Sequence, residues 1–118
     1  MIYRLMIVEE AYRDVRRNAD WWAEHHSLTQ AERWADAIWK KIRTLDQFPE
    51  SCPLAYENDD FPYELREALF GLGSRPGYRI LFTVTDDLIV VLGVRASEQD
   101  WLKPGDLPPL PPTDGKIK

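Results

Sequence analysis

Residues 77–95, GYRILFTVTDDLIVVLGVR, decide the fold. Two runs rich in β-branched and aromatic residues flank the pair Asp86-Asp87, a pattern typical of two strands joined by a tight turn. The stretch therefore predicts a β-hairpin whose turn lies at the two aspartates.

An arginine lies near the open end of each predicted strand. If the strands pair symmetrically about the turn, Arg79 faces Val94 and Arg95 faces Tyr78. Neighbouring residues of a strand point to opposite faces, so the two arginines are predicted to lie on opposite faces of the sheet. Arg95 is then the structural arginine, with a long stem that packs and a guanidinium that reaches a helix carboxylate.

Both faces of this hairpin are apolar, and a sheet of that kind needs cover on both sides. The face with the larger aromatics is expected to pack on helices. The other face is expected to form an open apolar groove that binds a partner segment, or to be covered by the acidic loop or the proline-rich tail. The predicted groove residues are Arg79, Leu81, Leu92 and Val94. Two readings stay open for Arg79 and Arg66: each arginine binds a target, or it holds one of the many carboxylates nearby.

Two helices precede the hairpin. Apolar residues recur at three- and four-residue steps over residues 9–25, and again from Ala31 to Phe48, where Pro49 ends the pattern. Thr29 followed by Glu32 has the spacing of a capping box at the start of the second helix. Short strands are predicted at residues 2–8 and 63–70. The chain is therefore an α+β protein of order β-α-α-β-β-β, with an antiparallel sheet and a two-helix hairpin packed on one face.

The length of 118 residues and the 44% hydrophobic content predict one compact domain. We place this domain at residues 1–103, with a proline-rich tail at residues 104–118 that is expected to be extended or disordered. The formal charge of −5 disfavours direct binding of nucleic acid, because that affinity comes from many basic contacts.

Several site classes are absent from the sequence. A single cysteine, Cys52, and no HExxH motif predict no metal site and no disulfide within the chain. The glycine-containing loop at residues 71–77 leads into a strand, so no cofactor site is predicted. The N-terminal apolar run is too short for a membrane span, and we expect a cytoplasmic protein without a membrane partner.

The element order, the segment AYRDVRRNADWW, and the strand LREALFG followed by GYRILF resemble the RelE/ParE superfamily of bacterial toxins from type II toxin-antitoxin modules. The resemblance covers residues 1–101. It implies a small toxin of the plasmid stabilisation type that inhibits growth and is neutralised by a cognate antitoxin protein. It also implies one of two activities: RelE-like members cut messenger RNA on the ribosome, whereas ParE-like members are non-enzymatic poisons of DNA gyrase.

Carried over from RelE-like nucleases, the catalytic candidates are Arg66 and Arg79. A second basic residue of the preceding strand would fall near Ala68, and no histidine follows His26. The deficit of basic groups favours the ParE-like, non-nuclease branch with DNA gyrase as the implied target. The alternatives are a ribosome-dependent endonuclease that uses Arg66 and Arg79, and a toxin-fold protein that binds a partner without poison activity.

Trp21 lies about 125° from the centre of the buried stripe on the first helix, at 100° per residue. It is predicted to be exposed. An exposed indole suits a protein interface, either with a partner protein or in a homodimer.

Overall fold

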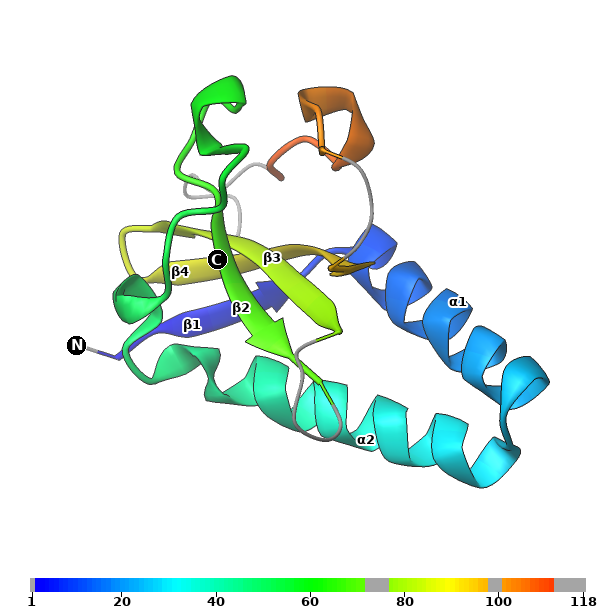
Figure 1. Cartoon of the computed structure of the whole chain (residues 1–118). Coiled ribbons are helices and arrows are strands. Elements are labelled where there is room, and N and C mark those ends of the chain that lie inside the picture. The colour runs from blue at the N-terminus through cyan, green and yellow to red at the C-terminus, as the bar shows by residue number, and fades with distance from the viewer. Residues whose placement is uncertain (1, 72–76, 98–100, 112–118) are drawn as a thin grey trace.

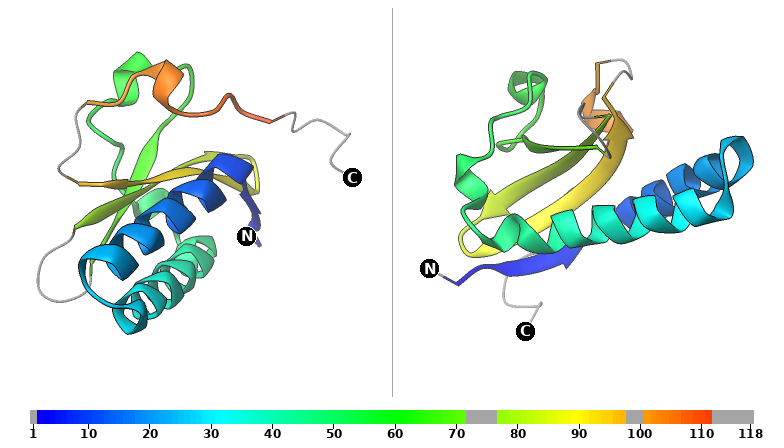
Figure 2. Two further views of the ribbon diagram at one scale, coloured as in Figure 1. Left: turned by 90° about the vertical axis from the view of Figure 1, so that its right-hand side faces the viewer. Right: turned by 60° about the horizontal axis from the view of Figure 1, so that its bottom comes forward.

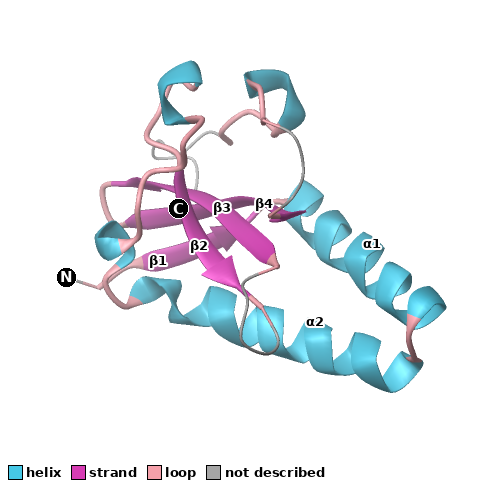
Figure 3. Cartoon of the chain, in the orientation of Figure 1, coloured by secondary structure: helices cyan, strands magenta, loops and turns pink. Residues whose placement is uncertain are grey.

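The computed structural model describes residues 2–71, 77–97 and 101–111. Two helices and a four-stranded sheet follow in the predicted order, and four short 3-10 turns lie in the connections (Figures 1 and 3). The bounds are β1 Arg4–Ile7, α1 Glu9–His25, α2 Leu28–Arg43, β2 Arg66–Phe70, β3 Tyr78–Thr85 and β4 Leu88–Ala96, with 3-10 turns η1 Thr44–Asp46, η2 Pro49–Ser51, η3 Asn58–Asp60 and η4 Pro104–Asp106. The α+β class and the element order are confirmed.

The sheet has the order β1-β4-β3-β2 and is mixed rather than fully antiparallel. The strand pairs β2–β3 and β3–β4 are antiparallel, whereas β1 runs parallel to β4. The prediction of an all-antiparallel sheet is wrong for this one pair. A tight turn forces antiparallel pairing, but the long connection between β1 and β4 leaves the direction of β1 to packing.

Both helices pack on one face of the sheet, as predicted (Figure 2). In α2 the spacing of Ala31, Trp34, Ile38 and Ile42 buries all four side chains, and the last three belong to the core shared with the sheet. The shared core also contains Ala11 and Val15 of α1 and, from the sheet, Ala68, Ile80, Phe82, Ile89, Val91 and Val94.

The two ends of α2 differ from the prediction. The helix begins after Ser27, whose hydroxyl oxygen accepts a hydrogen bond from the Gln30 amide at 3.1 Å, so the cap is Ser27 and not Thr29. At the other end the helix tightens into η1. Phe48 has a positive φ of 57° and is 81% exposed, so its assignment to the buried stripe is wrong.

The β3–β4 hairpin follows the predicted pairing only near its turn. From Thr85 opposite Leu88 to Phe82 opposite Val91 the register is as expected. A β-bulge then shifts the register by one residue and leaves Leu92 without a partner. Because side chains alternate between faces, a one-residue shift places each β4 residue beyond the bulge on the face opposite to the predicted one.

Beyond the bulge, Arg79 therefore lies directly opposite Arg95. The prediction that the two arginines lie on opposite faces is wrong, because facing residues of an antiparallel pair share a face. Val94 moves with the shift and joins the helix-covered core instead of the predicted groove.

The second face of the sheet is covered. The loop before β2 and the segment after β4 lie side by side over it, on the side away from the helices (Figures 1 and 2). The second core pairs Ala55, Phe61, Leu65, Leu102 and Leu107 of this cover with Leu81, Leu88, Val90 and Leu92 of the sheet. The prediction of an open groove is thus wrong. The alternative, that the loop and the first part of the tail cover this face, is confirmed.

Candidate functional site

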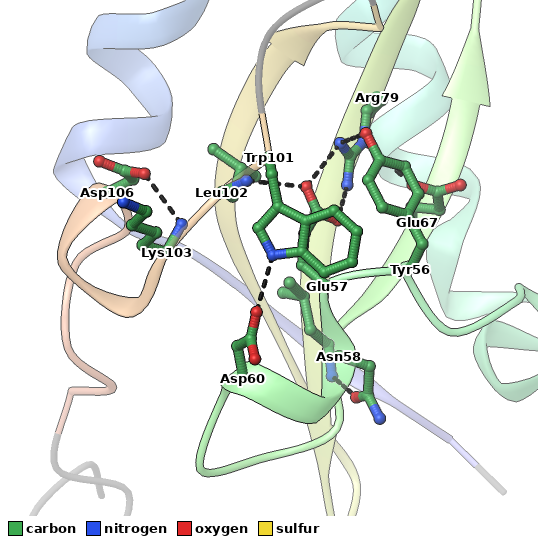
Figure 4. Close-up of polar contacts among 11 residues, drawn as sticks. Tyr56, Glu57, Asn58, Asp60, Glu67, Arg79, Trp101, Leu102, Lys103 and Asp106 are labelled. Carbon is green, nitrogen blue, oxygen red and sulfur yellow. Dashed lines mark hydrogen bonds and ion pairs between the residues drawn. The ribbon is translucent and has the colours of Figure 1, made fainter.

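The central polar feature under this cover is an ion pair between Arg79 of β3 and Glu57 of the loop (Figure 4). Arg79 donates from Nη1 to Oε2 of Glu57 at 2.9 Å and from Nη2 to Oε1 at 2.6 Å. The side chains are 2% and 0% exposed. Two parallel charge-assisted hydrogen bonds are the strongest arrangement available to a guanidinium and a carboxylate. The expectation that Arg79 lies free in a groove is therefore wrong, and the alternative, that Arg79 holds a nearby carboxylate, is confirmed.

Three further groups complete this cluster. The backbone amide of Leu102 donates to Oε2 of Glu57 at 3.0 Å, and the Tyr56 hydroxyl accepts from Nη1 of Arg79 at 3.0 Å. Oε1 of Glu67, on β2, lies 3.0 Å from Nε of Arg79, without the alignment of a hydrogen bond. The cluster ties the loop, the C-terminal segment and two strands together.

Both members of the pair stay charged at neutral pH. Burial alone would raise the pKa of Glu57, but the hydrogen bonds from Arg79 and from the Leu102 amide outweigh burial and hold this pKa below its ordinary value. Burial alone would lower the pKa of Arg79, and the contact with Glu57 outweighs it and raises that pKa. Neither group is poised to exchange a proton near pH 7, as a general acid or base would be.

The other nuclease candidate, Arg66, lies on the opposite face of the sheet. Arg66 pairs with Phe82, which faces the helices, whereas Arg79 lies among the residues of the second face. Its guanidinium donates to the backbone carbonyls of Glu50 at 3.2 Å and Cys52 at 2.7 Å, and it lies 3.3 Å from Glu64. The fold therefore does not bring Arg66 and Arg79 together in one site.

Arg95 has the structural contacts that were predicted for it. Its Nε lies 3.6 Å from Oδ2 of Asp14 on α1, and its Nη2 donates to the carbonyl of Asp106 in η4 at 2.6 Å. The same carboxylate oxygen of Asp14 accepts the Val94 amide at 2.9 Å. Arg95 thus links α1, β4 and the C-terminal segment.

A sequence model described as "ParE toxin of type II toxin-antitoxin system, parDE" matches residues 5–101. The chain belongs to the ParE toxin family. It is therefore a type II toxin by family. The expected membership of the RelE/ParE superfamily is confirmed, and the matching family is ParE.

A solved structure described as "Chromosomal ParDE TA system from P. aeruginosa" is similar to this ParE-family chain, with a TM-score of 0.66 and 18% sequence identity. The match covers 82% of this chain and 98% of that one, and at this identity it shows a shared fold. A search of curated proteins found no match.

Two kinds of feature are absent from the part of this ParE-family chain that the structure describes. No helix there is both long and apolar enough to cross a bilayer. In the same residues, no group of three or more His, Cys, Asp and Glu side chains is placed to hold a metal ion.

Trp21 of this ParE-family chain is 46% exposed on α1, as its position on the helix predicted. Its ring stacks on His25, with centroids 4.5 Å apart and planes at 16°, and it meets Trp22 edge to face at 5.6 Å. The exposure is confirmed, and the role of Trp21 in binding a partner stays a prediction.

Sequence reasoning missed Glu57, Tyr56 and Trp101. These residues lie in irregular segments where no periodicity marks a side chain that points inward. One signal was available: an arginine in an otherwise apolar strand needs a carboxylate partner if both faces are covered. The acidic loop before β2 was the nearest supply of such carboxylates.

Proposed function

We propose that this ParE-family toxin acts as a non-enzymatic poison of a gyrase-type target and is neutralised by a cognate antitoxin. The observation that carries the non-nuclease part is the separation of Arg66 and Arg79 by the sheet itself. Cleavage of RNA needs basic groups gathered around one phosphate, to activate the 2′-hydroxyl and to stabilise the developing charge. Here each guanidinium is already bound by protein oxygens.

The family match supports the gyrase-type target, because the chain matches the ParE model over residues 5–101. The net charge of −5 also disfavours entry into a ribosomal RNA environment. The structurally similar chain comes from a system described as ParDE, which supports a paired antitoxin for this chain.

For antitoxin binding, two groups of residues were predicted from the sequence. Leu81, Leu92, Val94 and Arg79 are buried, so an antitoxin could contact them only after the cover or the helices moved away. Trp21 is exposed and needs no such movement. We therefore propose α1 around Trp21 as the first contact surface, for an antitoxin or for a second copy of this chain.

The test uses the purified full-length chain in two assays. In a DNA supercoiling assay with purified gyrase, the chain is expected to block supercoiling, and the antitoxin encoded beside it is expected to restore the reaction. In a purified translation system, messenger RNA is expected to stay intact. Ribosome-dependent cuts that vanish in Arg66→Ala would replace the proposal with the endonuclease alternative.

Growth of an expressing strain separates the remaining alternative. A chain that folds, binds its antitoxin and leaves both growth and gyrase unaffected would be a partner-binding protein without poison activity. For the surface, Trp21→Ala is expected to weaken antitoxin binding or self-association, as measured by calorimetry and analytical ultracentrifugation. If neither changes, Trp21 is not an interface residue.

A further inference from the structure

Two aromatic rings of the cover remain exposed above the buried ion pair. Tyr56 precedes Glu57 in the loop, and Trp101 precedes Leu102 in the segment after β4. Their ring centroids are 5.0 Å apart with planes at 60°, and the residues are 53% and 50% exposed (Figure 4). Aromatic pairs that remain half exposed on a folded surface are typical anchors of protein interfaces.

Both rings are held by their polar ends. The indole Nε1 of Trp101 donates to Oδ2 of Asp60 at 2.7 Å, and the Tyr56 hydroxyl accepts from Arg79 at 3.0 Å. The guanidinium carbon of Arg79 lies 4.8 Å from the centroid of the Tyr56 ring. The rings are thus fixed before any partner arrives, which lowers the entropy cost of binding.

The charge around the rings is negative. Asp59 and Asp60 are exposed in η3, and Glu57 and Glu67 lie beneath, beside the single guanidinium of Arg79. Glu57 and Glu67 thus face the Arg79 guanidinium, and Asp59 and Asp60 add two exposed carboxylates in η3. Lys103 follows on the other side of Leu102, where its backbone amide donates to Asp106 at 2.9 Å (Figure 4).

We propose that Tyr56, Trp101, Asp59 and Asp60 form a docking surface for a cationic segment of a partner protein. An arginine or lysine side chain of that segment lies over the exposed ring faces, whose quadrupole attracts cations, and its charge pairs with the aspartates. The surface does not use Arg66 or Trp21, so the inference stands or falls independently of the gyrase-type target.

Other occupants fit less well. An acidic segment would meet like charge from the aspartates. A purely apolar segment would remove the two carboxylates from water with no cation to balance their charge, which costs free energy. A cation is attracted both by the ring faces and by the carboxylates.

The experiment titrates the full-length chain with a hexapeptide of alternating arginine and glycine and, as a matched probe, with the same peptide carrying glutamate for arginine. The arginine peptide is expected to bind saturably and to shift the NMR signal of the Trp101 indole N–H but not that of Trp21. The glutamate peptide is expected not to bind. Affinity for the arginine peptide is expected to fall as salt is added.

Three variants separate the ring and charge contributions. Trp101→Ala is expected to weaken binding of the arginine peptide by about fivefold or more. Asp59→Asn removes one charge and none of the contacts that hold the rings, so it tests the surface even if Trp101→Ala fails to fold. Leu28→Ala, at an exposed apolar side chain of α2 outside both proposed surfaces, is the control and should bind as the wild type does.

Three outcomes would overturn the proposal. The first is no saturable binding of the arginine peptide at millimolar concentration. The second is equal binding of the two peptides. The third is wild-type affinity in Asp59→Asn together with wild-type affinity or loss of folding in Trp101→Ala.

Discussion

At the scale of single residues, Arg79 is an arginine in the middle of an apolar layer, and it is tolerated because Glu57 meets it there. Removing both charges from water costs free energy, and two short hydrogen bonds at 2.6 and 2.9 Å offset much of that cost. Such a buried ion pair adds little to the free energy of unfolding compared with two apolar side chains of similar size. Loss of one partner, however, leaves the other charge buried and uncompensated.

The variant Arg79→Ala is therefore expected to lower the free energy of unfolding by about 3–5 kcal/mol, as measured by urea denaturation. The double variant Arg79→Leu with Glu57→Leu should lose less, because neither charge of this pair then stays buried alone, although Glu67, 14% exposed, still loses its neighbouring cation. Trp21→Ala, on the exposed face of α1, should stay within about 0.5 kcal/mol of the wild type. A loss below about 1 kcal/mol in Arg79→Ala would mean that the cover does not bury the pair in solution.

The pKa of Glu57 also predicts how stability depends on pH. The folded-state pKa lies below the ordinary value of 4.5, so the unfolded chain takes up this proton at a higher pH than the folded chain does. The contribution of Glu57 to stability is complete above that ordinary value and is lost as the pH falls through the lowered folded-state pKa. Urea unfolding at a series of pH values should show a shallower acid loss for Glu57→Gln than for the wild type. Parallel curves for the two proteins would refute this assignment.

At the scale of secondary-structure elements, α2 depends on a cap that the sequence analysis placed at Thr29 and that the structure places at Ser27. Gln30 lies three residues after Ser27, and Glu32 lies three residues after Thr29. Both pairs have the spacing of a capping box. In the folded chain, the Ser27 hydroxyl accepts from the Gln30 amide.

Ser27→Ala is accordingly expected to cost about 1 kcal/mol in thermal or urea unfolding. Thr29→Ala lies inside the first turn and serves as the matched control, with an expected change within about 0.5 kcal/mol. A larger loss in Thr29→Ala than in Ser27→Ala would move the start of the helix to the sequence-based position.

The sequence predicts the helices and the hairpin turn because their signals are local: periodic apolar residues and a pair of aspartates between β-prone runs. It does not predict the bulge. One extra residue, Leu92, has the same apolar character as its neighbours, and only the adjacent Gly93 marks the site. A Cβ on Gly93 would lie 3.0 Å from Oδ2 of Asp14 and 3.2 Å from a methyl group of Leu107, so this close approach favours glycine.

For the candidate site, the sequence identified Arg79 and Trp21 but not what surrounds Arg79. Trp21 follows from helix geometry alone, and its exposure is as predicted. The partner of Arg79 lies 22 residues earlier in an irregular loop, and the second support comes from the amide of Leu102, beyond β4. Contacts of this kind depend on how loops fold over a sheet. Periodic sequence patterns do not predict that conformation.

At the scale of the whole molecule, the protein has three layers: helices, sheet and a thin cover of loop and C-terminal segment (Figure 2). The predicted domain boundary at residue 103 falls inside the third layer. Leu107 lies beyond that boundary and is buried in the second core.

A chain that ends at residue 103 is therefore expected to lose at least about 2 kcal/mol of unfolding free energy, because it lacks the Leu107 side chain and the contact between Arg95 and Asp106. A chain that ends at residue 111 keeps every described contact and should match the full-length chain. Urea denaturation of the three proteins decides between them. Equal stability of the two truncated chains would support the boundary at residue 103.

The parallel pairing of β1 with β4 has a consequence for synthesis. Arg4 pairs with Leu88, so the first strand to leave the ribosome has no partner in the sheet until the last strand emerges. Folding must close a loop that contains most of the chain, and contacts so distant in sequence form slowly. A nascent chain of this ParE-family protein therefore remains without its complete sheet until β4 has emerged from the ribosome, which delays assembly of the folded domain.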